Sequence, residues 1–180
     1  MKKIICICNI LLIYMVMLYP VLVLFGNKVR IFIYIWEHIF NNNALIPLMI
    51  LIIFAAVTLI LNILFHALAI KNGEDDLFLA KSNYIVKLIE IPAYIVIFAV
   101  GVICALSIFT AGFTIGLAVM DLVSLCCTGI YACTCYRLLN NKGMLTRMEY
   151  VQYSVLSFIY CADVIAAFLV YRKCRSSLKK

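Results

Sequence analysis

Polar and ionisable side chains inside long apolar stretches are the residues of this sequence that could do chemistry. Asp121 and Asp163 each lie within such a stretch, and another stretch carries Thr58, Asn62 and His66 at steps of four residues. A spacing of four puts side chains on one face of a helix. A central aspartate costs about 2.5–3.5 kcal/mol in a membrane helix, so it should face protein. These five residues predict a buried polar centre that relays protons or holds a cation.

The same residues also fit a purely structural role. Asparagine, histidine, hydroxyl and acidic side chains hydrogen-bond across membrane helices at about 0.6 kcal/mol each and so hold a bundle together. Gly112 and Gly116 precede Asp121 at a small-residue spacing that lets two helices approach closely. Both interpretations stay open on the sequence alone.

Lys87 and Glu90 form a second candidate, an interfacial ion pair. They lie three residues apart, where side chains on a helix can meet across one turn. We place them near the entry to an apolar stretch that starts at Ile91, with Pro92 interrupting the hydrogen-bond ladder just behind them. This position favours a structural ion pair at the membrane surface.

No catalytic or metal-binding motif accompanies these residues. The sequence contains no His-Glu-x-x-His, no Gly-x-Ser-x-Gly and no phosphate-binding loop. The two histidines, His38 and His66, lie on different segments without acids or cysteines at ligand spacing. Most of the nine cysteines fall in apolar stretches, where a thiol behaves as a small hydrophobe. We therefore expect no catalytic residues, no metal, no cofactor and no enzymatic activity.

The composition of the chain indicates that lipid, and not water, surrounds it. The 180-residue chain is 67% hydrophobic and 13% charged, with a mean hydropathy of +1.15. Soluble domains are about 45–50% apolar and about 25% charged, so a soluble globule would expose large apolar patches. The net charge of +7 fits loops that face anionic lipid headgroups, and we do not expect nucleic-acid binding.

The predicted fold is all-α, a single polytopic transmembrane bundle over residues 1–180. A crossing needs about 20 apolar residues, and five stretches meet this length: 4–25, 44–70, 91–110, 112–136 and 151–171. The first run is too long for a signal peptide and lacks a cleavage site, so we expect it to be retained. Residues 31–40, rich in aromatics, are too short to cross and predict an interfacial helix.

Orientation is ambiguous with five crossings, because lysine and arginine then divide almost evenly between the two sides. A four-crossing arrangement with both termini inside therefore stays open. In either arrangement, we expect the N-terminus on the inner side.

Two stretches of the chain resemble a known family. Lys87–Tyr94 and Phe158–Ile165, and the intervening segment with Asp121, resemble segments of a family of small polytopic membrane proteins of Gram-positive bacteria. The function of that family is unknown, so no residue roles follow from it. The resemblance implies a bacterial cytoplasmic membrane.

Two functions fit these observations. The first is a non-enzymatic accessory or interaction protein of the membrane, favoured by the lack of catalytic motifs and of any soluble domain. The alternative is a small homo-oligomeric transporter or channel that uses the intramembrane acids for proton or cation coupling. The expected partners are the lipid bilayer and either further copies of this chain or another membrane protein.

Overall fold

The computed structural model describes residues 2–25, 29–72, 76–106 and 111–177, and over these residues it is helical without strands. This confirms the all-α prediction. The helices are α1 (Lys2–Phe25), α2 (Arg30–Tyr34), the π-helical η1 (Ile35–Ile39), α3 (Leu45–Asn72), α4 (Asp76–Ala105), α5 (Ala111–Asn141), α6 (Arg147–Leu156) and α7 (Ala162–Ser177).

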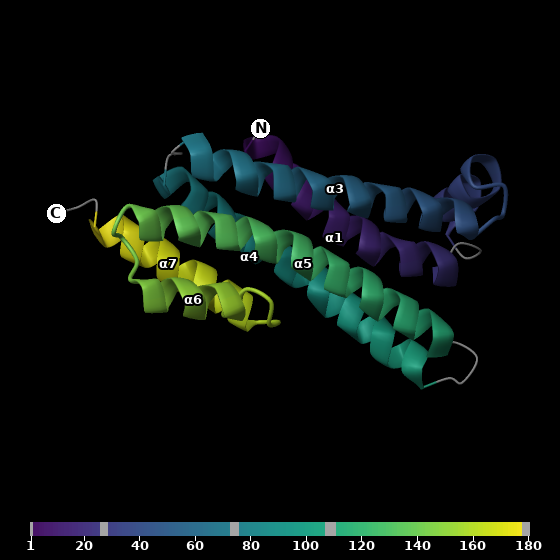
Figure 1. Ribbon diagram of the computed structural model, residues 1–180. Helices are drawn as coiled ribbons and strands as arrows, with labels where there is room; N and C mark the ends of the chain where they lie inside the picture. Colours follow the sequence, from purple (N-terminus) through teal and green to yellow (C-terminus); the bar gives the residue numbers. More distant parts are fainter. Residues whose placement is uncertain (1, 26–28, 73–75, 107–110, 178–180) are drawn as a thin grey trace.

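Four helices in the described part of the chain are long and apolar enough to cross a membrane. These spans are Lys3–Leu24 in α1, Leu45–Ala69 in α3, Phe78–Ala105 in α4 and Gly112–Asn141 in α5. Successive members run in opposite directions, which gives an up-and-down bundle (Figure 1). The predicted turns at 71–76 and 109–112 fall partly on residues outside the described ranges.

The third span differs from its prediction at its start. We expected it to begin at Ile91, with Lys87 and Glu90 at the entry, but the apolar helix runs from Phe78. Both charged residues therefore lie inside a candidate span. Inside the bundle α7 brings a second carboxylate, that of Asp163, to Lys87.

The fifth predicted span, 151–171, is not one helix. It divides into α6, of 10 residues, and α7, of 16 residues, both shorter than the roughly 20 needed to cross. In Figure 1, α7 doubles back beside α6, so the two form a hairpin. Cys161, at the tip, adopts a φ of +64°, a left-handed conformation that turns the chain. The structure thus corrects five crossings to four candidate spans and a helical hairpin.

Specific contacts fix the base of this hairpin. Thr146 caps α6 through a reciprocal pair of hydrogen bonds with Glu149, and Lys173 of α7 bonds both carboxylate oxygens of Glu149 at 2.5 and 2.6 Å. The hydrogen bonds from Lys173 lower the pKa of Glu149 to about 2. The ends of α6 and α7 are thereby tied together.

The tip of the hairpin is seated on α5. A Cβ atom added at Gly129 would lie 2.5 Å from Cε1 of the Phe158 ring, so only glycine leaves room for that ring. Along its length α6 packs against α5, and α7 packs against α4. The hairpin therefore covers one side of the bundle.

A polar layer divides the apolar core in two. One apolar cluster surrounds Phe65 and Tyr131, and the other surrounds Leu12 and Leu51. On each of the four long helices, buried polar residues stand between members of the two clusters. They include Asn9 in α1, Thr58 and Asn62 in α3, Asn83, Lys87 and Glu90 in α4, and Thr128 in α5.

The segment predicted over residues 31–40 is helical, as α2 and η1, and none of its residues is buried. Tyr34 and His38 stack with their ring centroids 4.4 Å apart. The segment lies at the end of the bundle opposite both chain termini (Figure 1). Its aromatic side chains are thus available to the surroundings.

Candidate functional site

Lys87 is the centre of a fully buried cluster of charged and polar groups. Its Nζ lies 2.8 Å from Oδ2 of Asp163 and 3.5 Å from Oε2 of Glu90, and all three side chains have an exposed fraction of 0%. Lys87 also donates to the Thr128 hydroxyl at 2.6 Å, and Thr128 donates in turn to the carbonyl of Leu125. Three helices, α4, α5 and α7, thus meet at one ammonium group.

The cluster holds two carboxyl groups for one ammonium. Tyr94 donates to Oε2 of Glu90 at 3.2 Å, but Oε1 of Glu90 has no hydrogen-bond partner among the described residues. An uncompensated charge is very costly in a buried apolar setting, so the surplus negative charge requires a proton or a cation. Glu90, whose second oxygen is unpaired, is the group best placed to hold it.

Asp163 reaches this centre because the helix breaks just before it. It lies in the first turn of α7, where the positive end of the helix dipole favours an anion. Its Oδ1 accepts from the backbone N–H of Val164 at 2.8 Å, which leaves Oδ2 to face Lys87. A continuous helix over 151–171 would have no free N–H groups at this position.

Asp121 lies next to the hairpin tip and does not contact Lys87. The Tyr160 hydroxyl donates to Oδ2 of Asp121, and the ring of Tyr160 meets that of Tyr94 edge-on with centroids 5.4 Å apart. Asp121 also lines a pocket of about 300 Å³ between α4 and α5. Two tyrosines in contact thus lie between Asp121 and the centre, Tyr160 bonded to Asp121 and Tyr94 bonded to Glu90.

The polar stripe of α3 serves helix pairing. Asn62 and Asn9 exchange hydrogen bonds at 2.8 and 3.3 Å, both fully buried, and Asn62 also donates to the carbonyl of Thr58. The Thr58 hydroxyl is buried without a hydrogen-bond partner in the described structure. This reciprocal amide pair clamps α1 to α3.

His66 joins neither aspartate. Its Nδ1 lies 2.8 Å from the Thr134 hydroxyl of α5, and that hydroxyl donates to the carbonyl of Ile130. With the hydroxyl proton directed at Ile130, the tautomer of His66 that carries hydrogen on Nδ1 completes the pair. The residue therefore ties α3 to α5.

The predicted polar centre is thus reorganised. We expected Asp121, Asp163 and His66 together and Lys87 with Glu90 apart, whereas Asp163 pairs with Lys87 beside Glu90. Asn9 was missed, although a single asparagine in an apolar run is a detectable signal. Within the described residues, no group of three histidine, cysteine or acidic side chains could hold a metal ion.

Comparison of the chain with protein-family models, with curated proteins and with solved structures finds no match.

Proposed function

We propose that the protein is a small membrane transporter that binds and releases a proton at the Lys87–Glu90–Asp163 centre. One observation supports this above the others: two carboxyl groups share one ammonium, all three are fully buried, and Oε1 of Glu90 is unpaired. Ionisable residues inside a membrane bundle mark proton or ion pathways by default.

The chemistry of the centre is the gain and loss of one proton. With Glu90 protonated, the ammonium and the Asp163 carboxylate balance each other and the centre is neutral. With Glu90 ionised, the centre carries one negative charge, which is strongly disfavoured in a low-dielectric interior. The ionised form therefore demands either hydration or rearrangement, and this coupling of protonation to conformation would let the centre take up a proton on one side of the membrane and release it on the other.

Proton movement into reconstituted vesicles tests the proposal. Vesicles containing the protein and a trapped pH dye would receive a potassium diffusion potential, inside negative. We expect acidification well above that of empty vesicles, and at least a tenfold slower rate for Glu90→Gln. Glutamine can still accept from Tyr94 and Lys87, so the variant should keep its fold, which circular dichroism would check.

Glu37→Gln is the matched control, since Glu37 is exposed in η1 and far from the centre. It should transport like the wild type. Repeating the assay with a sodium-sensitive dye separates proton movement from cation movement. Vesicles that acidify no faster than empty ones, or a Glu90→Gln variant that matches Glu37→Gln, would refute the transporter.

The proposed location is the cell membrane, with several crossings. Four apolar helices of sufficient length support it, and the resemblance noted in the sequence points to a bacterial cytoplasmic membrane. We further propose that α2 and η1 lie in the headgroup region, because Trp36 and its aromatic neighbours favour that depth. A spin label at position 36 should report this interfacial depth.

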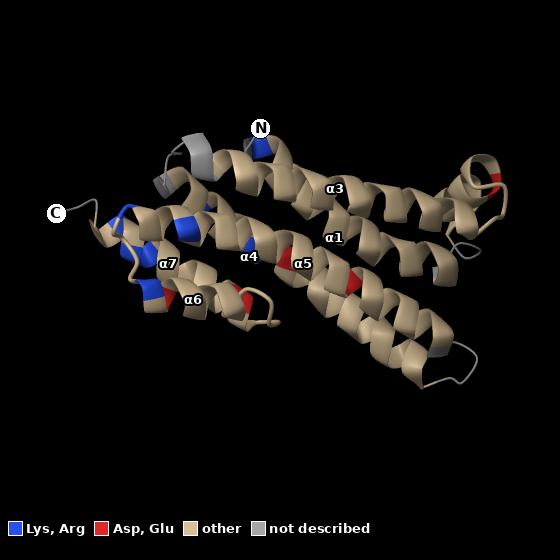
Figure 2. Ribbon diagram, in the orientation of Figure 1, with Lys and Arg blue, Asp and Glu red and all other residues tan. Residues whose placement is uncertain are grey.

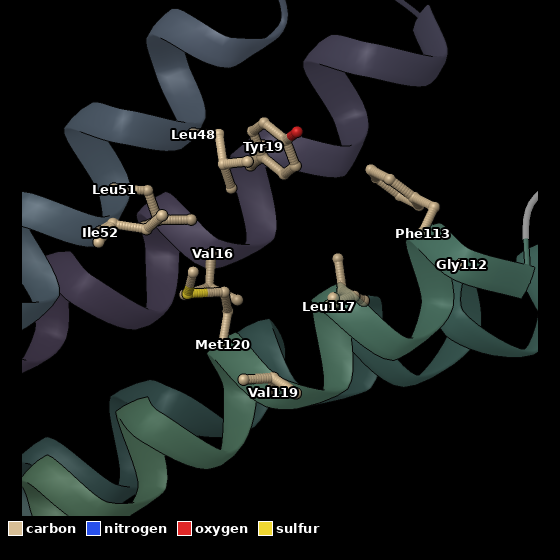
Figure 3. Close-up of a pocket in the computed structure, with 11 residues that line it drawn as sticks. Val16, Tyr19, Leu48, Leu51, Ile52, Gly112, Phe113, Leu117, Val119 and Met120 are labelled. Atoms are coloured by element: carbon tan, nitrogen blue, oxygen red, sulfur yellow. The ribbon is translucent and has the colours of Figure 1, made fainter.

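The second candidate function is that of an accessory or interaction protein. It is favoured by a face of small residues that does not serve packing within the protomer. A Cβ atom at Gly112 or Gly116 would meet nothing within 4 Å, so this spacing does not serve packing within the protomer. Both glycines line an apolar pocket of about 350 Å³ between α1, α3 and α5, into which Tyr19 and Met120 project (Figure 3). Small residues at such spacing let another membrane helix approach.

Gently solubilised protein, purified from its own host, distinguishes the two candidates. A transporter should purify as a defined homo-oligomer without a companion. An accessory protein should co-purify in fixed ratio with a second membrane protein, and Gly116→Leu should release that companion. Gly101→Leu, at another glycine with open space around it, is the control that should retain the companion.

A further inference from the structure

The hairpin of α6 and α7 begins and ends at the same end of the bundle. α5 delivers the chain to the start of α6 at the same end of the bundle where α7 finishes (Figure 1). The N-terminus of α1 lies at that end as well. Four crossings and a returning hairpin therefore place both termini on one side of the membrane.

The tip of the hairpin lies at membrane depth. Asp163 contacts Lys87, which lies nine residues, or about 14 Å of helix rise, inside the span that begins at Phe78. The base of the hairpin is charged, with the Glu149–Lys173 pair and with exposed Arg147, Arg172 and Arg175. The tip is apolar, and the backbone N–H groups of Phe158, Ile159 and Asp163 are paired within it. An apolar tip with a paired backbone and a charged base indicate a re-entrant element.

With this topology, the distribution of basic residues is no longer balanced. By chain order, only Lys28 and Arg30 of the 15 lysines and arginines fall on the opposite side, and Lys87 is internal. Figure 2 shows the basic residues gathered at the end that holds both termini. Glu149 and, by chain order, the acids at 74–76 also fall on that side, but acids contribute little to orientation.

We propose that α6 and α7 form a re-entrant hairpin which enters from the cytoplasmic side, and that the arginines at its base bind anionic phospholipid headgroups of the inner leaflet. Three exposed guanidinium groups, those of Arg147, Arg172 and Arg175, lie next to the hairpin base. Guanidinium groups bind phosphate with paired hydrogen bonds, and basic groups at a cytoplasmic surface are attracted to anionic lipid. This inference is independent of proton transport.

Reporter fusions test on which side of the membrane the two ends of the hairpin lie. A green fluorescent protein domain folds into its fluorescent form only on the inside when exported by the general route, and alkaline phosphatase is active only outside. Each reporter would be fused after residue 143, in the loop before α6, and after Lys180. We expect both positions to be fluorescent and inactive as phosphatase. Opposite results at the two positions would mean that 151–171 crosses the membrane, and phosphatase activity at both would overturn the cytoplasmic orientation.

Native mass spectrometry tests the proposed binding of anionic lipid. The purified full-length protein would be titrated with phosphatidylglycerol and, separately, with phosphatidylcholine. We expect tighter binding of the anionic lipid, weakened roughly a hundredfold when Arg147, Arg172 and Arg175 are all changed to glutamine. Arg30→Gln, at the opposite end, should leave this preference unchanged. Equal binding of both lipids, or an equal loss in Arg30→Gln, would overturn the headgroup assignment.

Discussion

Replacing Lys87 by methionine tests most directly whether the buried centre holds the hairpin in place. Methionine fills a similar volume but removes the ammonium that lies 2.8 Å from Asp163. Two carboxyl groups would then be buried without a cation. Breaking a buried ion pair on one side costs about 3–5 kcal/mol, so we expect a loss of that size in the free energy of unfolding.

A second variant separates the interaction between Lys87 and Asp163 from the other effects of the Lys87 substitution on stability. Asp163→Asn retains the oxygen that caps Val164 while removing the charge. Combined with Lys87→Met, it eliminates one of the two orphaned acids, so the double variant should be less destabilised than the sum of the single variants. The expected coupling energy is about 1–3 kcal/mol.

The assay is reversible unfolding in mixed micelles of a mild detergent and dodecyl sulfate, followed by circular dichroism. Lys81→Met is the matched control, because Lys81 lies in the same helix with an exposed side chain. Its effect should stay within about 0.5 kcal/mol. The reasoning fails if Lys87→Met costs no more than Lys81→Met, or if the two changes at the centre are additive.

Three further predictions concern the hairpin. Gly129→Val should displace the Phe158 ring and lower the free energy of unfolding by about 1–3 kcal/mol, whereas Gly101→Val, in open space, should not. The pKa of Glu149 is lowered in the folded state, so its ion pair stabilises the protein above the ordinary pKa near 4.5 and loses its effect as pH falls towards 2. The difference in unfolding free energy between wild type and Glu149→Gln should therefore be constant above about pH 5 and shrink below it, and a difference that grows on acidification would contradict the assignment. Cys161→Gly should stabilise the tip by up to about 1 kcal/mol in the same unfolding assay, because glycine adopts a φ of +64° without a Cβ clash, and destabilisation would show that the conformation is not maintained.

Because apolar length is a local property, the sequence predicts that four long helices exist, though not where the third span begins. The break between α6 and α7 is different. Residues 157–161 contain neither glycine nor proline, so local chemistry gives no reason to stop a helix there. The turn is held by distant groups, since Phe158 fits against Gly129 and Asp163 pairs with Lys87. Such tertiary causes cannot be read from hydropathy.

The candidate site was predicted in its residue types but not in its grouping. Asp163, Lys87 and Glu90 were each identified, because charges in apolar stretches stand out. Their assembly depends on how α7 lies against α4, and one sequence does not contain that information. His66 and Asn62 were predicted near the acids, but they bond Thr134 and Asn9. Helical spacing defines a shared face without identifying the neighbour that the face meets.

The link between Lys87 and Asp163 has a consequence for synthesis of the chain. α4 leaves the ribosome long before α7, so Lys87 must enter the bilayer while its main counter-charge does not yet exist. Glu90, one turn away, is the only acid of the centre available then, and it can act as a temporary partner. A nascent chain that stops before residue 162 would hold the Lys87–Glu90 pair without the contact to Asp163. Lys87 therefore reaches its final set of contacts only after α7 has been made.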